Sequence, residues 1–430
     1  MSANSFAIPM PLLPARRALE DTRPARHAFG VLDFLLCTYV VLLPWQIEIV
    51  VDFRVAPSDL FLFLALILGG ISLRYVAPAW SIWQLSLPVL FGIGTLVSVA
   101  AEGELSRYVL VNKCVGLGVL FLFYMLVTTT TRSWLSIRRV LQVLVVSVTL
   151  ENIASLAAFL AGRSYGLYVP WLNGNPYRLC GALVDANAYG GLLVLTLTIN
   201  EVASSGEAPL MNRIFKNFAS LTLLLGIVCT FSRSAWMALA TIWIATWFFR
   251  RRVALRMAVA AVAAALATPL FGAGVLVYAR DMASRPDQIA QRLDIITNAG
   301  AYISQHPFLG IGLGGYLERE GVIVHNTSLW FLTEFGVIGL FVLFGFLGWF
   351  LWKGMESYRR APVSEKPLVL SLVLAHVGTF VLSMGIEAFY TRPWWLIFGL
   401  IASSYCITLR EGAAVRYIPA AFLPVPKEQS

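Results

Sequence analysis

Charged residues are scarce in this sequence: Asp, Glu, Lys and Arg together make up 13% of 430 residues. Hydrophobic residues make up 58%, and the mean hydropathy is +0.75. Soluble globular domains are about 25% charged and about 45–50% apolar. The shortage of charge therefore excludes a water-soluble fold and indicates a polytopic membrane protein.

Three further patterns are missing. The five cysteines form no CxxC pair and lie mostly in apolar runs, which excludes a disulfide framework or a cysteine metal site. The first 28 residues hold four arginines but lack the apolar run of a signal peptide, so we expect a cytoplasmic tail. The acidic residues show no DxD or HxxE spacing, and we therefore predict neither a metal ion nor another cofactor.

Apolar segments are plentiful. A spanning helix needs ~20 mostly apolar residues, and about twelve segments fit: 29–46, 58–74, 81–101, 108–128, 140–161, 187–203, 217–231, 234–249, 253–278, 328–352, 367–388 and 393–409. We predict an all-α polytopic membrane protein with about twelve transmembrane helices. Its single membrane domain covers 29–409, between cytoplasmic tails at 1–28 and 410–430.

The formal net charge of +9 is consistent with a nucleic-acid partner, but the placement of the basic residues argues against one. With the N-terminus inside and the segments alternating, 21 of the 32 Lys and Arg residues fall in cytoplasmic segments and ten in periplasmic ones. The remaining one, Lys113, lies within a predicted helix. The positive-inside rule therefore predicts that both termini are cytoplasmic, and it makes the periplasmic arginines exceptions that need a reason.

The longest weakly apolar segment inside the chain, residues 279–325, lies between the ninth and tenth predicted helices. It is too short to form an independent core and too long for a plain turn. Its 287–305 part has apolar residues at helical spacing. We expect a small helical cap on the periplasmic side.

His325 ends this segment, and Asn326 follows it at the border of the next apolar run. A helix that starts near Asn326 would leave His325 at the boundary between water and lipid. A histidine there titrates near neutral pH and can take a proton from a hydroxyl group. The alternative is an interfacial histidine whose ring is satisfied by backbone groups.

Three arginines on the same predicted face are candidates for anion binding, because a guanidinium contacts phosphate oxygens in pairs. Arg178 lies in an irregular loop just before Asp185 and Asn187, which we predict as caps of the sixth helix. Arg233 lies in a very tight turn between two apolar helices, and Arg292 lies on the cap helix. The alternatives are a solvated loop cation for Arg178, an arginine that extends to the interface for Arg233, and a solvated helix face for Arg292.

Two other patterns allow different interpretations. HPFLGIGLGGY at 306–316 follows no strand, so it is no dinucleotide fingerprint, and we expect its glycines to permit close packing. Ionisable residues inside predicted helices face polar interiors, and they keep a transporter with a proton path as an alternative. These residues are Asp33, Lys113, Glu151, Glu334, His376 and Glu387.

Four motifs together resemble the bacterial O-antigen ligase and polymerase superfamily. HN at 325–326, followed nine residues later by GVIG, resembles its histidine motif, and SRSAW at 232–236 resembles a second motif at a helix start. The segments QRLDIITNAGAYISQHPFLGIGLGGY at 291–316 and RLCGALVDANAYGG at 178–191 resemble two more. The length of the chain and its single cap are similar to the ligase branch.

The resemblance implies a GT-C-like membrane glycosyltransferase in the inner membrane of a Gram-negative bacterium, with its active site facing the periplasm. It would transfer O-antigen polysaccharide from undecaprenyl pyrophosphate to lipid A-core. His325 would be the catalytic base, Arg178, Arg233 and Arg292 would bind pyrophosphate, and Asn187 and Asn326 would support them. No carboxylate pair suits a glycosidase, so a single inverting displacement is expected. A polymerase, a protein O-oligosaccharyltransferase, a transporter and a membrane scaffold remain alternatives.

Overall fold

The computed structural model describes residues 30–45, 47–50, 53–69, 80–103, 106–166, 169, 172, 177–183, 185–267 and 286–416. Its helices are α2 (Val31–Val41), α3 (Pro57–Gly69), α4 (Ile82–Glu102), η3 (Val109–Val115, a π-helix), α5 (Gly116–Thr130), α6 (Trp134–Tyr165), η4 (Gly181–Leu183, a 3-10 turn), α7 (Ala186–Ala203), α8 (Arg213–Thr230), α9 (Arg233–Phe249), α10 (Arg251–Ala267), α12 (Pro286–Gln305), α13 (Gly315–Glu320), α14 (Thr327–Arg360), α15 (Lys366–Ser383) and α16 (Arg392–Arg416). The predicted tail at 1–28 and most of the tail at 410–430 lie outside the described residues.

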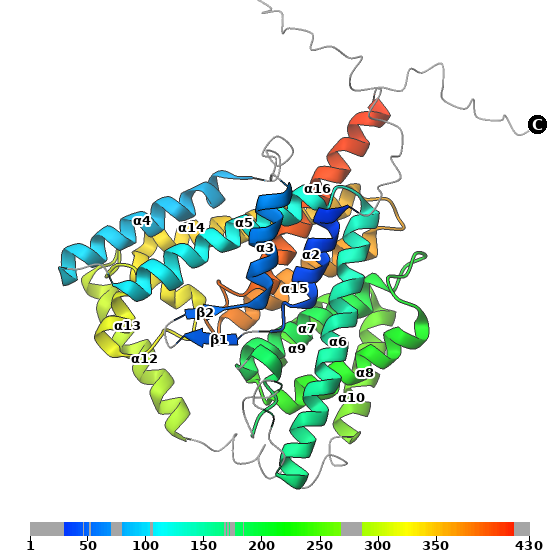
Figure 1. Cartoon of the computed structure of the whole chain (residues 1–430), viewed down its shortest axis with the longest axis horizontal. Helices are drawn as coiled ribbons and strands as arrows, with labels where there is room; N and C mark the ends of the chain where they lie inside the picture. Colours follow the sequence, from blue (N-terminus) through cyan, green and yellow to red (C-terminus); the bar gives the residue numbers. More distant parts are fainter. Residues whose placement is uncertain are drawn as a thin grey trace, which may run out of the picture.

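Each of the twelve predicted apolar segments overlaps one of these helices (Figure 1). Within the described ranges, six helical segments are long and apolar enough to cross a membrane: Ile82–Glu102, Val109–Thr130, Trp134–Gly162, Arg213–Thr230, Thr327–Arg360 and Lys366–Ser383. The chain is therefore a multi-pass membrane protein with a helical fold. Several predicted boundaries differ from the structure. Helix α6 begins at Trp134, before residue 140, and α14 ends at Arg360, after residue 352. Helix α15 ends at Ser383, which leaves Glu387 outside the helix.

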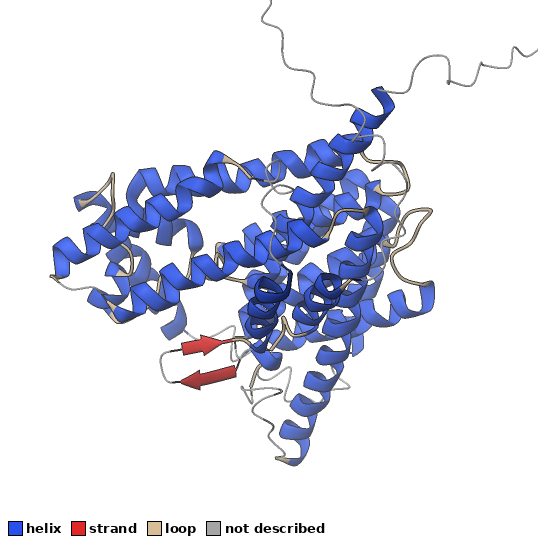
Figure 2. Cartoon of the chain, turned by 45° about the horizontal axis from the view of Figure 1, so that its top comes forward, coloured by secondary structure: helices blue, strands red, loops and turns tan. Residues whose placement is uncertain are grey.

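One departure from the predicted all-helical fold is a small hairpin. Strands β1 (Ile47–Val50) and β2 (Phe53–Val55) pair antiparallel after α2 (Figure 2). In Figure 1 α12 lies at the lower left of the molecule, far from the C-terminal end of α16 at the upper right.

Side-chain caps fix where several helices begin. Ser133, Asn212 and Ser232 each accept a hydrogen bond from the backbone N–H three residues further on, at the starts of α6, α8 and α9. The first N–H groups of a helix have no partner within it, and a Ser or Asn side chain supplies one. The tight α8–α9 turn around Arg233 therefore has a local cause, the cap at Ser232.

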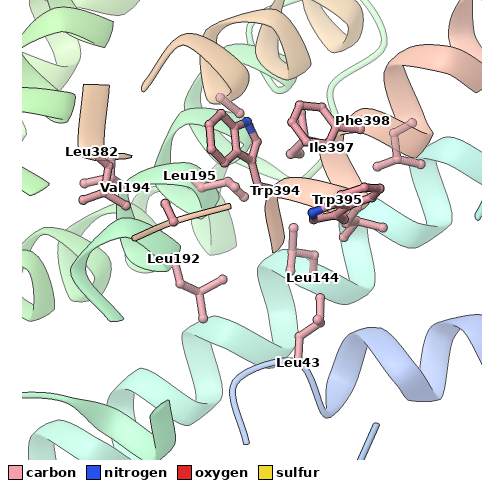
Figure 3. Close-up of a cluster of buried hydrophobic side chains, with 14 of the residues drawn as sticks. Leu43, Leu144, Leu192, Val194, Leu195, Leu382, Trp394, Trp395, Ile397 and Phe398 are labelled. Atoms are coloured by element: carbon pink, nitrogen blue, oxygen red, sulfur yellow. The ribbon is translucent and has the colours of Figure 1, made fainter. Parts of the chain in front are cut away.

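Large apolar side chains fill the centre of the bundle. Trp394, Trp395 and Phe398 of α16 lie near Leu144 of α6 and Leu192 of α7 (Figure 3), and all five side chains are buried. Inside a bilayer, close van der Waals packing drives helix association, because lipid tails are as apolar as the side chains. This packing makes the helices a rigid frame for the polar groups at their ends.

Helix α14 is broken at Gly336, which has φ 65° and ψ −162°. In an unbroken helix, the N–H groups of residues 337 and 338 would donate to the carbonyls of residues 333 and 334. Here they donate to Pro307 O (2.8 Å) and Phe308 O (3.4 Å) instead. The carbonyls of residues 333 and 334 accept from Ile311 N (3.0 Å) and Gly312 N (3.1 Å). The 306–314 loop thus replaces two helical hydrogen bonds with four bonds between segments.

Close approach explains the glycines of this loop. A Cβ on Gly310 would lie 2.3 Å from the carbonyl carbon of Glu334, and one on Gly336 would lie 2.3 Å from that of Phe308. Both glycines also have positive φ, which other residues adopt only with strain. The prediction that the glycines of the 306–316 segment permit close packing is confirmed.

Candidate functional site

The candidate site lies where α14 begins. Asn326 is extended, and its side-chain oxygen accepts from Leu329 N at 3.0 Å, so it caps the helix. Thr327 bonds the segment after α15, with its Oγ1 donating to Ile386 O (3.2 Å) and accepting from Ala388 N (3.0 Å). His325 therefore stands one residue before the cap of a firmly anchored helix, and its side chain is exposed.

Charges from three other parts of the chain act on His325. Desolvation by neighbouring protein atoms lowers the pKa of its imidazole below the ordinary value of 6.5, and the positive charge of Arg292 lowers it further. The carboxylates of Asp185 and Glu387 oppose these effects. A lowered pKa keeps the ring neutral at physiological pH, which is the form that accepts a proton.

Arg233 and Arg292 lie near each other although 59 positions separate them in the sequence. Arg233 is the first residue of α9, directly after Phe231 in left-handed backbone (φ 49°) and the cap Ser232. Partial desolvation by neighbouring protein atoms lowers the pKa of the Arg292 guanidinium from its ordinary value, and the charge of Arg233 lowers it further. Both side chains are exposed. Two exposed cations that repel each other create a positive region suited to a polyanion.

Arg178 forms a different set of contacts. It is half-buried, and its Nε donates to Thr230 O (2.8 Å) while its Nη2 donates to Asn187 Oδ1 (2.8 Å). The next residue, Leu179, donates from its backbone to Cys229 O (2.9 Å). These bonds attach the 177–183 loop to the end of α8, next to the turn that carries Arg233. Arg178 and Asn187 thus hold the arginine turn in place.

The start of α7 has one of the two helix caps that were predicted from the sequence. Asp185 is the cap, and its Oδ1 accepts from Asn187 N (2.6 Å) and Ala188 N (3.4 Å). Asn187 was predicted as a second cap, which was wrong, since it lies inside the first turn and accepts from Arg178. The loop before it is fixed by buried Glu151, which accepts from Ala182 N at 3.1 Å.

Helix α12, which carries Arg292, is attached to α13 by one carboxylate. Glu320 accepts from Asn298 Nδ2 (2.8 Å) and from Tyr302 Oη (2.7 Å). Tyr316 Oη donates to Ile295 O at 3.2 Å and adds a second contact. The amphipathic helix expected at 287–305 is present, and these bonds hold it against α13, the short helix that precedes His325.

Two charged residues near the site were singled out in the sequence only as ionisable groups inside helices. Lys113 of η3 and Glu387, in the loop after α15, form a buried ion pair whose side chains are 5% and 10% exposed. The sequence signal for Lys113 was a lone cation in an apolar run. Its partner could not be identified from the sequence, because 274 residues separate the two.

No group of three or more His, Cys, Asp or Glu side chains placed to hold a metal ion occurs among the residues that the structure describes. His325 and the arginines near it offer an imidazole beside guanidinium groups. Such a set can accept a proton from a hydroxyl group and can neutralise negative charge on phosphate oxygens.

Fold and site together define a multi-pass membrane protein in which a histidine before α14 lies near arginines of α9 and α12. Residues 218–344 match a family model described as O-Antigen ligase. The matched segment contains Arg233, Arg292, His325 and Asn326, and it confirms the resemblance predicted from the motifs. No curated protein matches the sequence.

Proposed function

We propose that this protein is an O-antigen ligase of a Gram-negative inner membrane. It transfers O-antigen polysaccharide from undecaprenyl pyrophosphate to a sugar hydroxyl of lipid A-core, and its active site faces the periplasm. What supports the proposal is that His325 lies near Arg292 and Arg292 lies near Arg233, close enough for their charges to interact. All three lie inside a segment that matches a family model described as O-Antigen ligase.

The chemistry follows from the donor. As the anomeric carbon leaves the lipid pyrophosphate, negative charge gathers on phosphate oxygens, and Arg233 and Arg292 neutralise it. Arg178 and Asn187 hold the turn of Arg233, and the charge of Arg178 adds to the positive face. A hydrogen-bond donor that is already oriented toward the developing charge lowers the activation barrier by ~2.7–4 kcal/mol.

His325 takes the proton of the acceptor hydroxyl as the new glycosidic bond forms, and Asn326 fixes its position through the cap of α14. General base catalysis of this kind contributes ~10²–10⁴ in rate. A single displacement inverts the configuration at the anomeric carbon, and the pyrophosphate leaves on the undecaprenyl lipid. The apolar lipid tail lies between helices, and the sugars lie in water.

The decisive experiment is transfer with purified protein in detergent, with undecaprenyl-pyrophosphate-linked polysaccharide as donor and lipid A-core as acceptor. Polysaccharide joined to lipid A-core is the expected product, and His325→Ala is the control. Lengthening of the lipid-linked donor in place of this product would identify a polymerase. Lasting absence of any product would exclude the enzyme and leave a transporter as the alternative.

The same assay tests the absence of a metal requirement. Because the site offers arginines for the pyrophosphate charge, we expect transfer to continue in EDTA. Loss of transfer in EDTA with recovery on addition of Mg²⁺ or Mn²⁺ would contradict the arginine-based mechanism.

A further inference from the structure

The ion pair between Lys113 and Glu387 is joined to the start of α14 through the backbone. Glu387 lies between Ile386 and Ala388, and both neighbours hydrogen-bond the side chain of Thr327, at 3.2 Å and 3.0 Å. Thr327 is two residues after His325. The position of the Glu387 carboxylate relative to His325 is therefore set by these two bonds.

Lys113 is held on the other side of the pair. It lies in the π-helix η3, and its Nζ is 4.4 Å from the ring centroid of Trp330 in α14 and 4.9 Å from that of Tyr390. Tyr390 Oη also donates to the carbonyl of Lys113 at 3.0 Å. Short π-helical segments occur frequently at functional sites. The ammonium group is thus fixed against α14 and against the loop that carries Glu387.

The groups facing this arrangement can be named. His325 faces Arg292 of α12, Asp185 at the start of α7, and Glu387. Glu387 in turn faces Lys113, Tyr108, Tyr390 and Glu334. A carboxylate without a cation would attract a proton to the nearby imidazole, since an opposite charge favours the charged form. A protonated imidazole cannot act as a base.

We propose that Lys113 and Glu387 are positioning residues for His325. Their ion pair fixes the start of α14 and cancels most of the Glu387 charge, so that His325 stays neutral and ready to accept the acceptor proton. The catalytic part of this inference rests on the proposed function, but the effect on His325 does not. Neither residue touches the substrates.

The test is an NMR titration of His325 in the full-length protein in detergent, with histidine labelled on the ring. The chain has four histidines, and the His325 signal is the one that His325→Ala removes. Lys113→Met should raise the titration midpoint of His325, and Glu387→Gln should lower it, each by about one pH unit. The double variant Lys113→Met/Glu387→Gln should cancel most of the Lys113→Met shift.

Glu201→Gln is the matched control. Glu201 of α7 forms a buried ion pair with Lys216 of α8 at 3.4 Å, with side chains 5% and 7% exposed, and Glu201 does not act on His325. This variant should leave the His325 midpoint unchanged. If Lys113→Met does not fold, the His325 midpoint in the near-isosteric variant Glu387→Gln still tests the proposal. Midpoints equal to wild type in every folded variant of the pair would reduce the ion pair to a structural contact and overturn the proposal.

Transfer assays separate this inference from the proposed function. With active wild type, the pH at which kcat/KM falls on the acid side should move with the NMR midpoint in each variant. Shifted midpoints in a protein that never transfers polysaccharide would reject the ligase and support the positioning effect. Active protein with unshifted midpoints would reject the positioning effect alone.

Discussion

In the proposed mechanism His325 acts only in the transition state, whereas the arginines also bind the donor before the reaction. Kinetic measurements can separate these two roles. A base acts only in the transition state, so His325→Ala should leave donor affinity nearly intact and lower turnover by ~10²–10⁴. The measurements are donor binding and single-turnover rate, after a check that the variant inserts and folds. Turnover at the wild-type rate would reject the base. Loss of donor binding as well would make His325 a phosphate contact.

The pH dependence should follow the charge of Arg292. The neutral form of His325 is active, and desolvation and Arg292 both lower its pKa, so the acid-side fall in activity should lie below the ordinary value of 6.5. Arg292→Gln removes one lowering charge, which raises the pKa and moves this fall to higher pH. A kcat/KM profile of both proteins checks the direction. A shift to lower pH would contradict the assigned interaction.

Arg233→Ala should weaken donor binding as well as turnover, because a guanidinium meets the pyrophosphate before the reaction begins. A barrier increase of ~2.7–4 kcal/mol is expected. Arg233→Lys should restore only part of it, since an ammonium group lacks the planar fork of donors. The measurement is donor affinity and kcat/KM for both variants, with Arg213→Lys, at the opposite end of the same helix pair, as the control. Full activity in Arg233→Lys would show that charge alone suffices.

At the scale of residues, sequence reasoning could name the members of the site but not their contacts. His325 and Arg233 could be chosen because they are polar exceptions at the ends of apolar runs, and Arg292 because it is a cation on the predicted cap helix. Arg178 was predicted to bind phosphate, and its observed bonds to Thr230 and Asn187 give it a holding role that no local pattern encodes. The pairing of Lys113 with Glu387 depends on how distant helices pack, which spacing along the chain does not reveal.

Among the elements, the junction between the 306–314 loop and α14 is the one most sensitive to substitution. Gly310→Ala would push a Cβ into the backbone of Glu334 at a positive φ of 69°. We expect a loss of at least ~1–3 kcal/mol, the cost of one strained backbone position. Gly300→Ala in α12, where a Cβ meets nothing within 4 Å, is the matched control. It should be neutral or stabilising by up to ~1 kcal/mol.

Thermal unfolding in detergent measures both glycine variants. A lower midpoint for Gly310→Ala and an unchanged or higher one for Gly300→Ala is the expected result. Equal midpoints would show that the loop can move away from α14 without cost.

Helix positions followed well from hydropathy, because burial in lipid requires long apolar runs with internally bonded backbone. The break at Gly336 could not be predicted in the same way. A glycine inside an apolar run is compatible with a regular helix, and only the distant loop that bonds at this point makes the break stable. The 47–55 hairpin was not predicted, because strands of four and three residues are too short to show an alternation of apolar and polar residues.

For the molecule as a whole, the charge distribution predicts both termini in the cytoplasm and α12 in the periplasm. A reporter active only in the periplasm should be silent when fused after Ser430. In a variant without native cysteines, Ser304→Cys on exposed α12 should react with a membrane-impermeant maleimide in intact cells. Val363→Cys, 72% exposed between α14 and α15, should react only after lysis. The reverse pattern would place the candidate site in the cytoplasm.

The exchange of hydrogen bonds at Gly336 has a consequence for biogenesis. The ribosome makes the 306–314 loop before α14, so the loop must wait for its partner to be synthesised and inserted. Until the loop docks, the carbonyls of Thr333 and Glu334 lack the donors that they have in the finished protein. A helix with unpaired backbone groups is costly in lipid, and an unbroken α14 is the cheaper structure on first insertion. The break at Gly336 is then a late event of assembly, and the segment between His325 and Gly336 reaches its working position only when the loop docks.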